Sequence, residues 1–283
     1  MGTKKHYPVI RRLTVGATEA PVNLNGIIDV PRLMSQVNHR LYRQSRVYET
    51  SVTVDADLPD ATTIEVFALA DSWWTMKALQ LAKTAWDESN AEELKMLGGK
   101  KARWSDFRVL HGVASPEELV ARQFASNLNP VQFTAGEFTP SRVVDQAGVT
   151  REFTWANTPA ADEYSIYAEY DRSGNTDVDP TTPATGPYTG LLPNLEADAA
   201  AALQQVGNEP PYNATQYPSG IWIKIATLHL GAGRQRLSTG FFNAPCGLVV
   251  LKNFGTSGIG NLDVQVEVKK GDYKGISAKS MLE

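Results

Sequence analysis

The chain is poor in cysteine and histidine, and it has no long apolar run. It has one cysteine, Cys246, and four histidines among 283 residues. An internal disulfide is therefore impossible, and a structural zinc site would have to rely on histidine and carboxylate ligands. No run reaches the ~18 consecutive apolar residues of a membrane-spanning helix, so we expect no membrane association.

Sequence motifs for catalysis are also missing. The closest approach to the nucleophile turn Gly-x-Ser-x-Gly is GTSG at 255–258, which lacks the final glycine. The glycine pairs at 231/233 and 258/260 lack the third glycine of a dinucleotide loop. We therefore predict that the protein is not an enzyme. The alternative, an enzyme on a β scaffold, would require His111, His229 and nearby carboxylates to meet in one pocket.

Basic residues are slightly outnumbered by acidic ones, 27 to 31, and they are unevenly distributed along the chain. The net charge is −4, which argues against a polyanion-binding protein that is basic throughout. Two basic runs stand out: Lys4, Lys5, Arg11 and Arg12, and then His39, Arg40, Arg43 and Arg46, the second interleaved with Tyr42 and Tyr48. Two interpretations stay open. The runs form a solvated tail and an ordinary strand edge, or they form a surface that faces phosphates.

What the chain has in quantity is β-strand pattern, most clearly at 220–270. LDVQVEVKK places Val264, Val266 and Val268 on one face, and GIWIKIATLHL alternates β-branched residues from Ile221 to His229 in the same way. GLVVL is continuously apolar, as in a strand covered on both faces. The glycines at 255, 258 and 260 predict a hairpin between the last two runs.

The rest of the chain predicts further strands with helices between them. Tyr48, Thr50, Val52 and Val54 share one face of a strand at 48–57, and a second strand follows at 62–70. Further strands are predicted at 105–111, 131–138, 149–156 and 163–170, and helices at 72–97, 115–126 and 194–206. The predicted fold class is mainly β: an antiparallel β-sandwich or jelly roll of about 8–10 strands with helical insertions in the connections.

We predict two regions. Residues 1–46 form a basic arm with short strands, and residues 47–283 form the sandwich, with a loop insertion at about 171–219. At the start of that insertion, DRSGNTDVD spaces Asp171, Asn175, Asp177 and Asp179 as a weak candidate calcium site. The same residue types are common in ordinary turns, so that interpretation stays open. No other cofactor is predicted.

A short basic segment (KKHYPVIRR), paired strands around a helical insertion at 72–97, and the closing strands GLVVL and LDVQVEVKKGDYKG together resemble one family. The chain resembles the single jelly-roll capsid proteins of small icosahedral viruses with single-stranded DNA genomes. The resemblance implies a subunit that assembles in many copies into the shell of a virion. It also implies that a set of interior residues contacts the genome: Lys4, Lys5, Arg11, Arg12, Arg40, Arg43 and Arg46.

The alternative is a carbohydrate-binding β-sandwich of a secreted or appendage protein. Aromatic side chains stack on sugar rings, and the candidate platforms are Trp73, Trp104, Trp155 and Trp222. The positions of these side chains distinguish the two hypotheses. A lectin would expose them in one cleft, whereas a shell subunit would bury most of them.

Overall fold

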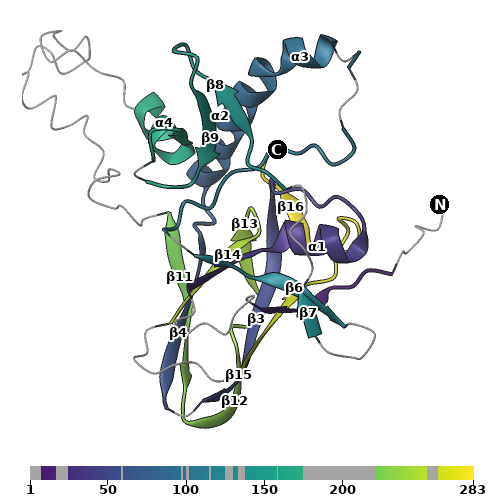
Figure 1. The fold of residues 1–283 in the computed structure, drawn as a ribbon, viewed down its shortest axis with the longest axis vertical. Helices are drawn as coiled ribbons and strands as arrows, with labels where there is room; N and C mark the ends of the chain where they lie inside the picture. Colours follow the sequence, from purple (N-terminus) through teal and green to yellow (C-terminus); the bar gives the residue numbers. More distant parts are fainter. Residues whose placement is uncertain are drawn as a thin grey trace, which may run out of the picture.

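Two packed sheets form the centre of the molecule, and a group of helices and short strands lies at one end of them (Figure 1). The structure is a computed structural model that describes residues 8–16, 25–58, 60–96, 98–99, 102–114, 116–124, 130–132, 138–157, 159–174, 221–253 and 261–283. The predicted mainly β fold with antiparallel sheets is confirmed.

The larger sheet has the strand order β12-β3-β15-β1-β6-β7. Its strands are β1 (Arg12–Gly16), β3 (Arg46–Leu58), β6 (Val120–Phe124), β7 (Pro130–Gln132), β12 (Gly233–Ser238) and β15 (Asn261–Val268). Two short strands, β13 (Phe242–Pro245) and β16 (Ala278–Ser280), also pair with the first half of β3. The long strand β3 therefore connects most of this sheet.

The second sheet has the order β11-β4-β14-β2-β5. Its strands are β2 (Asn25–Asp29), β4 (Thr62–Leu69), β5 (Glu117–Glu118), β11 (Trp222–Leu230) and β14 (Leu248–Asn253). All its pairs are antiparallel except β2 with β5. A third sheet holds β8 (Arg142–Val144), β9 (Thr150–Thr154) and β10 (Glu163–Ser165).

Four helices complete the described elements. They are α1 (Val30–Asn38), α2 (Trp73–Ser89), α3 (Ala91–Met96) and α4 (Ile166–Gly174). The predicted helix at 72–97 is thus confirmed as α2 and α3. Helices α2 to α4 and the third sheet lie between β4 and β11 in the chain and occupy the upper part of Figure 1.

Four strand pairs are nested in the order of the chain. β4 pairs with β11, β3 with β12, β2 with β14, and β1 with β15, so that early strands always pair with late ones. The pairs β3–β15 and β4–β14 then join this ribbon into its two sheets. The central fold is therefore a long antiparallel ribbon bent into two layers.

The buried faces follow the sequence pattern closely. Val54 lies opposite Val264 and Val52 opposite Val266, and all four side chains are buried. The apolar run Leu248–Leu251 is buried throughout. Val249 and Leu251 join the core between the two sheets, whereas Leu248 and Val250 join a second core under the β4–β11 insertion. The prediction that this strand is covered on both faces is confirmed.

Strand pairing in the last quarter differs from the prediction. β14 and β15 lie in different sheets, so the predicted hairpin between them is wrong. In β11 the register shifts between Lys224 and Ala226. Ile221 is buried as predicted, but beyond the shift Leu228 and Leu230 are buried and His229 is exposed.

Two further predicted elements are wrong for local reasons. The segment 116–124 forms β5 and β6 instead of a helix, because its backbone pairs with β2 and β1 and buries Leu119 and Ala121. The strand predicted at 163–170 ends at Ser165, whose Oγ accepts a hydrogen bond from Ala168 N (3.1 Å) and so caps α4.

Two segments of the predicted arm, 12–16 and 25–29, form strands of the two central sheets. β1 and β2 contribute to different sheets, and Leu13, Val15 and Ile28 lie in the core between them. Asp29 ends β2 and caps α1, because its Oδ1 accepts a hydrogen bond from Arg32 N (3.0 Å). The predicted helix at 194–206 and most of the predicted loop insertion, from residue 175 onward, lie outside the described residues.

Candidate nucleic-acid interface

Four basic side chains gather at the start of β3: Arg40, Arg43, Arg46 and Lys274, which we call the basic surface. Two tyrosines support it. The Arg46 guanidinium carbon lies 3.6 Å from the centre of the Tyr273 ring, and Lys274 Nζ lies 5.2 Å from the same ring. Tyr42 packs edge-on against Tyr273 with 6.0 Å between ring centres. Aromatic faces hold cations in this way through the ring quadrupole.

The local fold explains why residues so distant in sequence meet here. Strand β16 pairs with the first half of β3, with Ser280 opposite Arg46. Before β16, the chain makes a tight turn in which Tyr273 and Ile276 bond each other's backbone, and Lys274 and Gly275 have φ of 52° and 93°. Positive φ at both central residues is the geometry of a type I′ turn, so Lys274 sits at its tip.

Hydrogen bonds fix the turn against the segment that follows α1. Tyr42 Oη donates to Lys274 O (3.1 Å), and Arg43 N donates to Tyr273 Oη (3.2 Å). Lys274 Nζ donates to Leu41 O. These contacts hold together the two chain segments that carry the four cations. They use few of the N–H groups of the arginine and lysine side chains, so the remaining N–H groups can donate hydrogen bonds to a ligand.

The basic surface is electrostatically strained. None of its four cations forms an ion pair with a residue that the structure describes. Burial lowers the pKa of Lys274, and the neighbouring Arg40, Arg43 and Arg46 lower it further. Burial raises the pKa of Asp106, the carboxyl group nearby, whereas Arg108 and Arg43 lower it. The site would gain from a bound anion.

A pH dependence follows from this arrangement. Because the pKa of Lys274 lies below the ordinary lysine value of about 10.4, the side chain loses its charge over a lower pH window than an exposed lysine does. The affinity for a labelled oligothymidine should therefore fall as pH rises through that window. Lys274→Arg keeps its charge throughout and should show a flatter profile by fluorescence anisotropy. Identical profiles would show that Lys274 makes no contact.

The structure places the other predicted basic residues differently. Arg12 Nη2 lies 2.7 Å from Glu267 Oε2, so β15 neutralises its charge. Arg11 is half-buried at the residue before β1, and Lys4 and Lys5 lie outside the described residues. Lys274 was missed by sequence reasoning, although GDYKG contains a turn signal.

The calcium prediction stays a prediction. Asp171 lies in helix α4, whereas Asn175, Asp177 and Asp179 lie outside the described residues. Within the described ranges, no group of three or more histidine, cysteine, aspartate or glutamate side chains could hold a metal ion.

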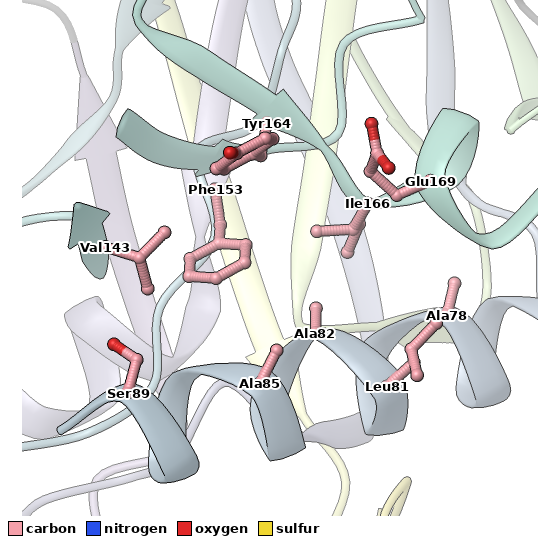
Figure 2. A pocket seen from close by; sticks show the side chains of 10 residues that line it. All are labelled: Ala78, Leu81, Ala82, Ala85, Ser89, Val143, Phe153, Tyr164, Ile166 and Glu169. Atoms are coloured by element: carbon pink, nitrogen blue, oxygen red, sulfur yellow. The ribbon is translucent and has the colours of Figure 1, made fainter. Parts of the chain in front are cut away.

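A large cavity lies between α2 and the third sheet (Figure 2). Its volume is about 470 Å³, and small or apolar side chains form most of its lining. Figure 2 shows Ala82 and Ala85 on the helix facing Phe153 and Ile166, with Glu169 at one side. This lining contains one carboxylate and no histidine or cysteine, so it lacks an acid–base pair.

The two strand-region histidines do not meet in the described structure. His229 is exposed on β11 and lies 3.2 Å from Thr63 Oγ1. His111 lines a separate pocket, where its Nδ1 accepts a hydrogen bond from Val113 N (3.0 Å) and burial lowers its pKa. Asp29 and Glu118 share that pocket but contact arginines. Among these described residues, no carboxylate orients the His111 ring as a general base would require.

Comparisons with protein families, curated proteins and solved structures find no match for this chain. Of the helices that the structure describes, none has the length and apolar character needed to cross a bilayer. The function is therefore inferred from the fold and from the surfaces described above.

Proposed function

We propose that the protein is a jelly-roll coat subunit that assembles in many copies around nucleic acid, as in a virion. The strand order supports the fold assignment. The orders β12-β3-β15-β1 and β11-β4-β14-β2 alternate early and late strands, as a ribbon of four nested pairs does when it winds into two sheets. Jelly rolls of this kind occur in viral capsid and lectin domains.

The observation that carries the nucleic-acid part of the proposal is the basic surface. Phosphate backbones are bound chiefly by lysine and arginine, and flexible single strands also stack on aromatic rings. Arg40, Arg43, Arg46 and Lys274 provide the charges, and Tyr273 lies directly beneath two of them. In a protein with net charge −4, this local excess of positive charge favours one polyanion-facing side.

Particle size and composition test this proposal. Light scattering and negative-stain microscopy of the purified full chain should show closed particles of megadalton mass. The ratio of absorbance at 260 and 280 nm should show nucleic acid inside them. A monomer or dimer over a range of salt and calcium concentrations would contradict the proposal, because a coat subunit must assemble with many copies of itself.

A carbohydrate-binding module is the second candidate, and one observation favours it. Trp155 and Trp222 line the same pocket of about 390 Å³, together with Phe67 and Lys252. The other two candidate tryptophans are exposed elsewhere: Trp73 packs against Tyr170, and Trp104 lies near Arg103. Trp155 is fully buried, so Trp222 would be the platform.

Tryptophan fluorescence during titration with mono- and disaccharides tests this second candidate. A saturable change that Trp222→Phe reduces would support sugar binding in the pocket. A flat titration across hexoses, hexosamines and sialic acid would contradict it, while the particle measurement is independent of this result.

A further inference from the structure

The pocket that His111 lines holds buried charge that the proposed coat function does not use. It has a volume of about 220 Å³ and lies where Asp29 and Arg32 at the β2–α1 junction meet Glu118 of β5 and the extended segment Arg108–His111. Arg32 and Arg108 side chains are 11% and 7% exposed. Burial of two arginines is costly unless their donors are satisfied.

The donors of Arg108 are not all satisfied. Its Nη1 lies 3.5 Å from Asp29 Oδ2, a long contact, and its buried Nε and Nη2 have no hydrogen-bond partner among the described residues. These two atoms form one edge of the guanidinium, with two parallel N–H groups that match the two oxygens of a carboxylate. At Arg142 the same two atoms both contact Glu152 Oε1, at 2.8 and 2.5 Å.

The position of Arg108 is well defined by its surroundings. Its backbone N donates to Ser141 Oγ (3.0 Å), and its carbonyl accepts from Ser141 N (2.8 Å). Its guanidinium carbon lies 4.1 Å from the centre of the Phe138 ring, so the ring covers one face of the group. The ring leaves the in-plane edge uncovered, but neighbouring atoms bury Nε and Nη2, so a ligand has to displace part of the lining to reach them.

We propose that this pocket binds a small carboxylic acid, held side-on by Nε and Nη2 of Arg108. The charge of the pocket favours a monoanion over phosphate. Asp29 and Glu118 already balance the two arginines, so each further negative charge is repelled by two carboxylates.

The remaining lining suits a short hydrocarbon group. Leu110, Pro140 and Leu248 are among the residues that line the pocket beside Phe138. A volume of about 220 Å³ holds a carboxylate with a few carbon atoms and excludes a large ligand. Butyrate is therefore a suitable probe, and butyramide is its uncharged equivalent.

Thermal unfolding of the full chain tests this assignment. Sodium butyrate should raise the melting temperature saturably, compared with sodium chloride at equal ionic strength, whereas butyramide should not. Inorganic phosphate should bind more weakly than butyrate. Arg108→Lys loses the parallel N–H pair and should weaken the affinity for butyrate by about tenfold or more. The matched control Arg142→Lys, where the pair is already occupied, should leave butyrate affinity unchanged.

A second variant, which is expected to increase butyrate affinity, tests the proposal if Arg108→Lys fails to fold. Glu118→Gln removes a repelling carboxylate at a side chain that is 36% exposed, so it should tighten butyrate binding. Equal responses of the wild type and Glu118→Gln, or no saturable response, would overturn the proposal. A glutamate-containing peptide that binds as tightly as butyrate would overturn the small-molecule assignment in favour of a partner chain.

Discussion

Adding one methyl group at Gly247 is expected to reduce the free energy of unfolding by about 2–5 kcal/mol. Gly247 has φ of 65° at the connection between β13 and β14, where the chain crosses from one sheet to the other. A Cβ there would lie 2.3 Å from Pro31 Cδ and 2.9 Å from Tyr48 Cδ2. Both neighbours are buried, so the clash adds to the cost of a left-handed backbone.

Gly240→Ala separates those two contributions. Gly240 has a similar φ of 71°, but an added Cβ would meet no atom within 4 Å, so its cost should be the backbone contribution alone, about 1–2 kcal/mol. Denaturant titration of both variants should therefore show the larger loss for Gly247→Ala. Equal losses would mean that Pro31 and Tyr48 do not lie as close to Gly247 as the structure has them.

Neutralising the exposed part of the basic surface should sharply reduce nucleic-acid binding. For single strands, the slope of log affinity against log salt is about −0.7 per phosphate contact, so four contacts predict about −3. Arg40→Gln combined with Arg43→Gln should move the slope to about −1.4 and weaken binding most at low salt. Titration of the labelled oligothymidine at several salt concentrations measures both effects.

The matched control lies at the other end of β3. Arg234 on β12 is exposed and lies 3.3 Å from Asp55, so Arg234→Gln removes a positive charge far along the strand from Arg46. Its salt slope should equal that of the wild type. If Arg234→Gln reduces the salt slope, per charge removed, as much as the Arg40→Gln/Arg43→Gln double variant does, nucleic acid binds to positive charge anywhere on the protein. The basic surface would then have no special role.

The sequence pattern predicts which faces are buried because burial depends on local alternation. Val264 and Val266 alternate with polar residues, and Leu248–Leu251 is apolar without interruption; both patterns correspond to the faces that the structure buries. Alternation carries no information about the partner strand, however. The prediction of a β14–β15 hairpin failed because the two strands lie in different sheets, where they pair with β2 and β3 from the beginning of the chain.

The candidate site shows the same limit. Arg40, Arg43 and Arg46 of the second basic run lie near one another because they are close in sequence. Lys274 joins them only because β16 returns to β3, and Arg12 is neutralised only because β15 places Glu267 beside it. Ion pairs and clusters between distant strands depend on register, which a single sequence does not contain.

The most direct test of the coat proposal is a reconstruction of the purified assembly by electron cryomicroscopy. It should show a closed shell in which Arg40, Arg43, Arg46 and Lys274 line the interior beside density for nucleic acid. A shell with this surface on its outside, or a chain that does not assemble at all, would contradict the proposal that the protein is a coat subunit with an inward nucleic-acid interface.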